Sequence, residues 1–413
     1  MMDTPNIRFK GFTDPWEQRK VSEITRFHKQ GYYTTEDYND NKKYYLLRGT
    51  DLTENKLILK DTPKINATEK DYQSFKTKKG DFLIVRSGTV GTYGIVDVDI
   101  PAIFGSYLID FRFDMEQVTN EFFGYFYESD LFKKQLRQIV QQSANTNINA
   151  ENIKSTSITL PSIAEQKKIS EYLRQIDNLI TLHQRKCDEM LELKKYMLQK
   201  MFPQNGEQFP EIRFSGFIEP WEQRKLEDLY QKIRNAFVGA ATPYYVDSGH
   251  FYLESNNVKD GQINHNTEVF INDEFYEKQK DNWLHAGDLV MVQSGHVGHT
   301  AVIPESLNNT AAHALIIIAN PIEKTSPHFV NYQFQTPNAK DGIDSITTGN
   351  TINHILVSEI KKFEIVVPCF EEQSKIGDYF RKLDDLITLH QRKCEEFKDI
   401  KKFMLRNMFP QKG

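Results

Sequence analysis

The sequence of 413 residues lacks several features that would assign a protein to a class at once. It contains three cysteines, Cys187, Cys369 and Cys394, which are too few for a disulfide framework and form no C-x-x-C pair of a zinc ribbon. No apolar run approaches the roughly 18 residues of a membrane helix, and the first residues lack the apolar stretch of a signal peptide. We therefore expect a protein of the reducing cytoplasm.

An excess of basic residues is also missing, because the formal net charge is −5 and the pI is about 6.2. DNA binding by such a chain would need locally concentrated basic groups or a partner that shares the task. The composition, with 39% hydrophobic, 12% aromatic and 26% charged residues, is that of a globular protein. The length predicts two or three domains.

Catalytic motifs are missing as well. The tract SGTVGTYG (87–94) lacks the G-x-x-x-x-G-K of a phosphate-binding loop and precedes a predicted strand, so we interpret it as a β-turn. No N-P-P-Y-like turn of an adenine methyltransferase occurs, the nearest string being NPIEK (320–324). The E-x-K triplets at 165–167 and 396–398 lie in charged helical segments, where such letters are common. We predict no catalytic residue and no enzyme activity for this chain.

What the sequence does contain is a long internal repeat. Residues 163–204 and 370–411 are identical at 25 of 42 positions. The nonapeptide LITLHQRKC begins at Leu179 and again, unchanged, at Leu386. Repeats of this length dictate architecture, so the two halves of the chain are expected to have related folds.

The repeat extends upstream of these segments. Residues 7–20 match residues 212–225 at 11 of 14 positions, and residues 80–96 match residues 287–303 more weakly, at 7 of 17. The order in each half is therefore a short leading segment, a divergent domain and a nearly identical helix. Divergent domains on a common scaffold indicate two related modules with different ligands.

Each repeated segment has the heptad pattern of a coiled coil, with apolar residues at steps of three and four. Lys194 and Lys401 also occupy seam positions. Ser162 with Glu165 predicts a capping box at the start of the first helix, and a helix of this length would span roughly 55–60 Å. The predicted seam consists of Ile169, Leu173, Ile176, Ile180, His183, Cys187, Met190 and Met197 in the first copy, and of Ile376, Phe380, Leu383, Ile387, His390, Cys394, Phe397 and Met404 in the second.

Two histidine–cysteine pairs on the seam allow two interpretations. If the helices pair antiparallel about their midpoints, His183 faces Cys394 and Cys187 faces His390, and four such groups can hold zinc. Cysteine is also a small apolar filler, and a seam histidine can fix the register of a coiled coil. We favour the second interpretation and predict no metal site, neither here nor at His296, His299 and His313, which lack supporting carboxylates.

The divergent regions 21–160 and 226–367 contain short β-branched and aromatic runs separated by Gly, Asn, Asp or Pro. These runs predict a mostly antiparallel sheet in each region. In the first region, helices are expected to follow the sheet near residues 119–142. The predicted class is α+β, with two mixed α/β domains separated by two long helices in an antiparallel coiled coil, related by an internal pseudo-twofold.

The whole chain resembles the DNA-specificity subunits of type I restriction–modification systems. The resemblance rests on the duplicated strings PWEQRK (15–20, 220–225), LPSIAEQ with VPCFEEQ (160–166, 367–373), GDFLIVRSGTVG with GDLVMVQSGHVG (80–91, 287–298) and LITLHQRK. It implies target-recognition domains at 1–161, with the leading segment, and 205–368, and spacer helices at 162–204 and 369–413. It also implies binding to double-stranded DNA, two methyltransferase subunits and restriction or translocase subunits. S-adenosylmethionine, ATP and Mg would bind those partners, and this chain would carry no cofactor.

We expect a subunit that recognises a bipartite, asymmetric DNA target and scaffolds the methyltransferase and endonuclease subunits. The open alternatives are a two-domain coiled-coil scaffold for proteins and an enzyme with an unrecognised site. Arg pairs well with guanine, and Asn or Gln with adenine, which guides the choice of base-contacting residues. The predicted DNA-binding residues are Arg48, Arg86, Ser87, Thr89 and Thr92 in the first domain and Asn256, Asn257, Gln293, Ser294, His296 and His299 in the second.

Overall fold

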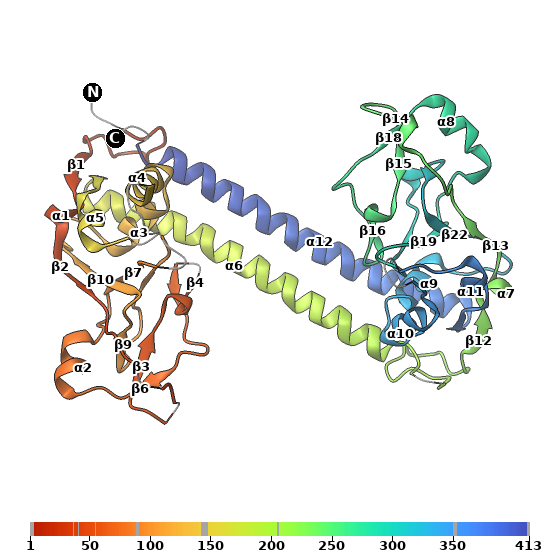
Figure 1. Ribbon diagram of the computed structural model, residues 1–413, viewed down its shortest axis with the longest axis horizontal. Coiled ribbons are helices and arrows are strands. Elements are labelled where there is room, and N and C mark those ends of the chain that lie inside the picture. The colour runs from red at the N-terminus through yellow and green to blue at the C-terminus, as the bar shows by residue number, and fades with distance from the viewer. Residues whose placement is uncertain are drawn as a thin grey trace. The chain divides into compact units, whose positions relative to one another are not determined.

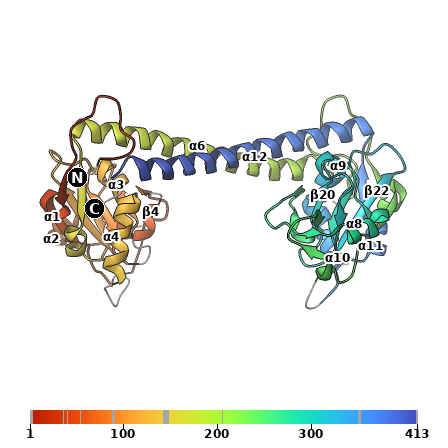
Figure 2. The ribbon, with the colours of Figure 1, turned by 90° about the horizontal axis from the view of Figure 1, so that it is seen from above.

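Two long helices organise the computed structural model, which describes residues 4–35, 37–39, 41–53, 55–87, 91–141, 148–204, 206–349 and 353–410. The chain divides into two compact units, Met1–His183 with Arg392–Gly413, and Gln184–Gln391. Helix α6 (Ile163–Lys200) and helix α12 (Phe370–Asn407) have 38 residues each, and each begins in one unit and ends in the other (Figure 1). Within each unit the two helix halves lie side by side and antiparallel (Figure 2).

The first unit is built on a six-stranded sheet with the order β2-β10-β7-β8-β5-β4, in which only β5 and β8 are parallel neighbours. A three-stranded sheet, β6-β3-β9, and the pair β1-β11 complete it. Its strands are β1 (Glu17–Lys20), β2 (Thr25–Gln30), β3 (Tyr44–Leu47), β4 (Leu52–Thr53), β5 (Lys56–Leu57), β6 (Lys64–Ile65), β7 (Phe82–Val85), β8 (Tyr93–Ile95), β9 (Ala102–Phe104), β10 (Leu108–Phe113) and β11 (Ser157–Leu160). Its shorter helices are α1 (Val21–Ile24), α2 (Glu69–Phe75), α3 (Asn120–Glu128), α4 (Asp130–Gln141) and α5 (Ala150–Ser155).

The second unit repeats this plan with the sheet β13-β22-β19-β20. A second sheet, β14-β18-β15-β21, the hairpin β16-β17 and the pair β12-β23 accompany it. Its strands are β12 (Glu222–Lys225), β13 (Tyr230–Asn235), β14 (Tyr245–Val246), β15 (His250–Leu253), β16 (Val258–Lys259), β17 (Gln262–Ile263), β18 (Phe270–Ile271), β19 (Leu289–Val292), β20 (Thr300–Val302), β21 (Ala311–Ala312), β22 (Leu315–Pro321) and β23 (Glu364–Val367). Its shorter helices are α7 (Leu226–Leu229), α8 (Asp273–Lys278), α9 (Pro327–Gln333), α10 (Pro337–Ile346) and α11 (Val357–Lys362).

The predicted α+β class and the mostly antiparallel sheets are confirmed. Helices α3 and α4 follow the first sheet, as the sequence predicted for that region. Of the apolar run KLILK (56–60) in the first divergent region, only Lys56–Leu57 forms a strand.

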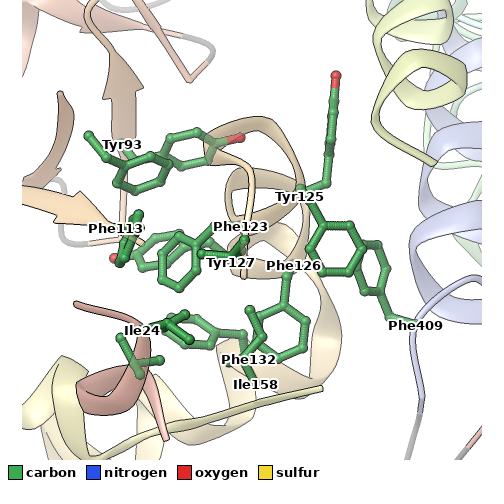
Figure 3. Close-up of a cluster of buried hydrophobic side chains, with 14 of the residues drawn as sticks. Ile24, Tyr93, Phe113, Phe123, Tyr125, Phe126, Tyr127, Phe132, Ile158 and Phe409 are labelled. Atoms are coloured by element: carbon green, nitrogen blue, oxygen red, sulfur yellow. The ribbon is translucent and has the colours of Figure 1, made fainter. Parts of the chain in front are cut away.

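Aromatic residues fill the core of the first unit (Figure 3). Phe123 from α3 packs on Phe113 from β10 with ring centroids 4.2 Å apart. Phe126, one turn further along α3, contacts both Phe132 of α4 and Phe409, which follows α12, at centroid distances of 5.5 and 5.8 Å. The segment after the last helix is therefore part of the first domain's core.

The leading segments attach to the long helices through equivalent ion pairs. Arg8 binds the Glu165 carboxylate through two hydrogen bonds of 2.8 and 2.7 Å, and Arg213 binds Glu372 through two of 2.7 and 2.8 Å. Both glutamates are almost fully buried. The predicted capping box is thus only half correct: the Ser162 hydroxyl accepts the Glu165 N–H at 3.4 Å, but the Glu165 carboxylate binds Arg8.

The leading segments also pair through their backbones with the ends of the long helices. The Ile7 N–H donates to the Asn407 carbonyl at 2.9 Å, and the Ile212 N–H donates to the Lys200 carbonyl at 2.8 Å. The same attachment therefore occurs in both units, once within a continuous stretch of chain and once between the two ends of the sequence. Among the described residues, no helix has both the length and the apolar character needed to cross a bilayer.

A buried carboxyl group lies in the first sheet. Asp110 on β10 is fully buried, and its Oδ2 accepts a 3.0 Å hydrogen bond from Arg112. Its Oδ1 has no hydrogen-bond partner among the described residues. Burial, together with the nearby Asp81 carboxylate, raises the pKa of Asp110 to about 7 from an ordinary value of 3.8.

This pKa predicts a specific pH dependence of stability. Folded Asp110 holds its proton more strongly than the unfolded chain does, so its stabilisation is complete below about pH 4 and lost by about pH 7. Relative to Asp110→Asn, the free energy of unfolding of the wild type should fall by about 1.4 kcal/mol per pH unit across that window, then stay level. Urea unfolding at pH 5–8 measures this, with the exposed Asp99→Asn as control. Parallel wild-type and Asp110→Asn curves would contradict it.

Candidate nucleic-acid interface

Two equivalent turns carry most of the predicted base-contacting residues. One joins β7 to β8 in the first unit, and the other joins β19 to β20 in the second. Their backbones close alike, since the Val85 N–H donates to the Thr92 carbonyl at 2.9 Å and the Val292 N–H to the His299 carbonyl at 2.8 Å. Thr89 lies outside the described residues. The turns carry Ser87, Thr89 and Thr92 in the first unit and Ser294, His296 and His299 in the second.

Two other predicted residues belong to short 3-10 turns, since Arg48 directly precedes the turn Gly49–Asp51 and Asn257 is the last residue of the turn Ser255–Asn257. Arg48 pairs with Asp51, with Nη2 3.2 Å from Oδ1, and keeps 37% of its side chain exposed. Asn257 occupies the place of Asp51 in the second unit, where its Oδ1 accepts the Glu254 N–H at 3.0 Å and its Nδ2 donates to two backbone carbonyl groups. Asn257 is 1% exposed and its amide is used within the domain, so it offers no free group to a base.

The residues that follow β7 and β19 differ in accessibility. Gln293 is 4% exposed, and its Nε2 donates to Asn235 Oδ1 at 2.9 Å, so its amide is likewise used within the domain. Arg86 stands at the matching place in the first unit and lines a pocket of about 270 Å³ together with His28 and Lys29. The Arg86 Nε is buried and has no hydrogen-bond partner among the described residues. Arg86 therefore stays a candidate, at a distinct pocket from Arg48.

Three predicted residues of the second unit do come together. Asn256, His296 and His299 line one pocket of about 210 Å³, with Lys259 also in its wall. Asn256 and His296 are exposed, and the Asn256 side chain makes no hydrogen bond with any described residue. Residues from two separate segments, one after β15 and one after β19, thus form one polar surface.

The sequence reasoning missed a segment that supports these turns. His354 Nδ1 lies 2.7 Å from the Ser294 hydroxyl, and the Ile355 N–H donates to the Gln293 carbonyl at 3.0 Å. In the first unit the Ile148 N–H donates to the Arg86 carbonyl at 2.9 Å. The signal was present in the sequence as the strings NTNIN (145–149) and NTINH (350–354), a further part of the repeat.

The histidines of the second unit do not gather around a common point. His313 lies 3.5 Å from Glu254 Oε1 and bonds the Gly239 carbonyl at 3.0 Å. His296 and His299 pack edge to face with ring centroids 6.5 Å apart. No cluster of three or more His, Cys, Asp or Glu with metal-binding geometry occurs in the described part of the chain.

The seam histidine and cysteine residues have packing contacts. Cys187 is buried against Leu383 and Ile387 in the second unit. In the first unit the His183 ring stacks on Phe397 with centroids 5.6 Å apart, and the Cys394 thiol lies 4.0 Å from the Ile180 carbonyl. None of the sixteen predicted seam side chains is exposed.

The two seam lysines form ion pairs across the helix pair. Lys401 Nζ lies 2.8 Å from Asp177 Oδ1 and 2.7 Å from Glu128 Oε2 in the first unit. Lys194 Nζ lies 2.7 Å from Asp384 Oδ1 in the second. Burial alone would lower the pKa of Lys401, but the Glu128 and Asp177 carboxylates raise it above its ordinary value. The two lysines occur at matching positions in the repeat, so the same lysine–aspartate ion pair joins the two helices in both units.

Comparison with known proteins gives a consistent result. A family model described as the type I restriction modification DNA specificity domain matches residues 13–192 and again residues 218–398. The putative type I restriction enzyme MjaX specificity subunit of Methanocaldococcus jannaschii is 23% identical over 407 residues, which cover 94% of this chain and 91% of that protein. The MjaVIII specificity subunit of the same organism is 21% identical over 285 residues, covering 67% of each chain.

Solved structures share the fold. The S subunit of a type I restriction-modification system from M. genitalium matches with a TM-score of 0.64 at 13% identity, covering 99% of this chain and 100% of that one. A chain from work on complex assembly and conformational transition of the type I R-M system matches with a TM-score of 0.53 at 14% identity, covering 97% and 100%.

The lysine pairs predict the effect of a single substitution. Lys401→Met leaves Glu128 and Asp177 largely buried without their cation, so the free energy of unfolding should fall by about 3 kcal/mol. The matched control is Lys393→Met, whose ammonium pairs with the exposed Glu396 and should matter by less than about 0.5 kcal/mol. Urea unfolding measures both, and equal effects of the two substitutions would contradict a buried role for Lys401.

Proposed function

The chain belongs to the family of type I restriction-modification DNA specificity proteins, and we propose that its two domains each recognise one half of a bipartite DNA target. The observation that carries this proposal is the contrast between scaffold and turns. Arg8 with Glu165 recurs as Arg213 with Glu372, whereas accessible polar residues on the equivalent turns differ. A shared frame with different side chains at one place is what two domains with two targets require.

The different turns make the target asymmetric. Thr92 in the first unit corresponds to His299 in the second, and Arg48 corresponds to Glu254. We propose Arg48, Arg86, Ser87, Thr89 and Thr92 as contacts to one half-site, and Asn256, Ser294, His296 and His299 as contacts to the other. Covalent linkage makes the second binding event intramolecular, so two modest contacts give one specific site.

The paired helices act as the spacer between the two half-sites in this proposal. Two helices of 38 residues extend about 57 Å each at 1.5 Å per residue. Half-sites one helical turn of DNA apart lie about 34 Å from each other, which is within this reach. Whole turns added to the helices are therefore expected to change the gap in the target.

The duplicated nonapeptide also suggests where partner subunits bind. The seam uses its isoleucine, histidine and cysteine, yet its leucines are identical as well and point outward. Leu179 and Leu182 are 37% and 41% exposed in the first unit, and Leu386 and Leu389 are 44% and 50% exposed in the second. Exposed leucines that recur unchanged are best explained by two copies of one partner, and we propose one methyltransferase subunit on each unit.

Methyl transfer, ATP use and DNA cleavage are assigned to partner subunits, and the net charge of −5 suggests that they share DNA binding.

This surface can be tested by substitution. The double variant Leu182→Asp and Leu389→Asp should reduce co-purification of the methyltransferase subunit at least tenfold, because a carboxylate would be buried at each contact. The matched control is Leu191→Lys, since the second copy already carries Lys398 at that place and is proposed to bind the same partner. Undiminished co-purification of the double variant would exclude this surface.

A domain exchange tests the proposed function itself. Residues 226–363 are replaced by residues 21–156, whose ends match through the hydrogen bonds Leu226 N–H to Phe363 and Val21 N–H to Thr156. Co-expressed with its methyltransferase subunits, the hybrid should methylate a target made of the first half-site twice. Genome-wide mapping of methylated adenines measures this. Two results would overturn the proposal in favour of a protein scaffold. Either the hybrid still methylates sites that contain the second half-site, or the wild-type chain shows no bipartite target.

A further inference from the structure

The pocket lined by Asn256, His296 and His299 contains a histidine, His299, whose tautomer is set by a backbone N–H group. The Asp260 N–H donates to His299 Nδ1 at 3.2 Å, so that nitrogen carries a lone pair and Nε2 carries the proton. Burial lowers the pKa of His299 below its ordinary value, with the Asp260 carboxylate opposing, so the ring is neutral near pH 7. His299 therefore presents one hydrogen-bond donor.

The donor that fixes this tautomer is itself rigidly placed. Asp260 and Gly261 both have positive φ, 51° and 87°, and form the two-residue turn between β16 and β17. The Gly261 carbonyl accepts a 3.0 Å hydrogen bond from Asn331 Nδ2. The φ of 87° at residue 261 favours glycine, and any other side chain there would also displace the Gln335 amide. The hairpin thus holds the Asp260 N–H against the imidazole without rearrangement.

The surroundings of the ring suit the edge of a DNA base. The pocket is lined by Ser255, Asn256, Val258, Lys259, His296 and His299. Lys259 and Lys340 make the potential at His299 more positive, as a phosphate-bearing ligand requires. The His299 side chain is 29% exposed, which leaves part of the ring accessible beside the exposed Asn256 and His296.

We propose that His299 is a specificity-determining residue that donates Nε2–H to an acceptor atom in the major groove and thereby excludes cytosine at one position of the second half-site. Guanine offers N7 and O6, adenine N7, and thymine O4 as acceptors, whereas cytosine offers the donor N4–H₂ there. A donor facing that amino group leaves both groups without a partner, which is the basis of discrimination. Thr92, at the matching place of the first unit, has a rotatable hydroxyl and imposes no such exclusion.

This inference rests on the proposed function, and one mapping experiment separates the two. The chain is co-expressed with its methyltransferase subunits in a host without adenine methylation, and methylated sites are sequenced for each variant. His299→Ala and His299→Phe, which remove the donor with and without loss of the ring, should both admit cytosine at one position of one half-site. Methylation of cytosine-bearing sites should rise at least tenfold, with the other half-site unchanged.

Two matched variants keep the donor. His299→Gln retains an N–H group of similar reach, and Asp260→Asn retains the backbone N–H and tolerates positive φ while removing the carboxylate, so both should still exclude cytosine. If His299→Ala misfolds, His299→Phe decides the question. The role of His299 is overturned if the wild type has a bipartite target and both donor-removing variants keep that target unchanged. It is also overturned if both variants reduce methylation equally at all sites. Relaxation toward a base other than cytosine overturns it too, whereas absence of any bipartite wild-type target overturns the proposed function instead.

Discussion

Two lysine–carboxylate pairs constrain how the long helices can associate: the half-buried pair of Lys401 with Asp177 in the first unit and the buried pair of Lys194 with Asp384 in the second. An apolar seam alone permits slippage by a heptad, but a charged seam residue must meet its partner or remain buried without compensation. The same carboxylates attach the domains, since the Tyr125 hydroxyl donates to Asp177 at 2.8 Å and the Tyr332 hydroxyl donates to Asp384 at 2.8 Å. Helix register and domain attachment are therefore fixed by one network in each unit.

Among the described residues, no hydrogen bond or ion pair joins the turns after β7 and β19 to the long helices. The ion pair of Arg8 with Glu165 recurs as Arg213 with Glu372 at nearly the same distances. The amides of Gln166 and Gln373 likewise donate to the chain just before each long helix. The turns, in contrast, differ in accessible side chains, as Thr92 and His299 illustrate. A frame that is conserved within one molecule and turns that are not allow each domain to acquire its own DNA preference without disturbing assembly.

The sequence predicted the α+β class and the two long helices because the chain contains its own comparison. A heptad pattern is local, and a repeat separates what is shared from what varies. The accessibility of single side chains on the turns could not be predicted from the sequence. Asn256 and Asn257 are adjacent and chemically identical, and the turn geometry that buries one and exposes the other comes from the fold.

Long-range partners were equally inaccessible to local reasoning. Glu165 fits a capping box, yet it binds Arg8, which lies 157 residues earlier. Ser294 and His354 are separated by 60 residues, and their contact depends on how a later segment returns to the turn. A sequence pattern predicts a partner that is close in the chain, whereas in the folded protein these residues contact partners that are far away in the chain.

The role of the helix pair as a spacer is tested most directly by adding one heptad to α6 and one to α12, placed so that the seam and both lysine pairs are preserved. The lengthened chain is expressed with the methyltransferase subunits proposed as its partners, and methylated adenines are mapped across the genome. The same two half-sites separated by a longer gap are the expected result. An unchanged gap between unchanged half-sites would contradict the idea that the helix pair sets their separation.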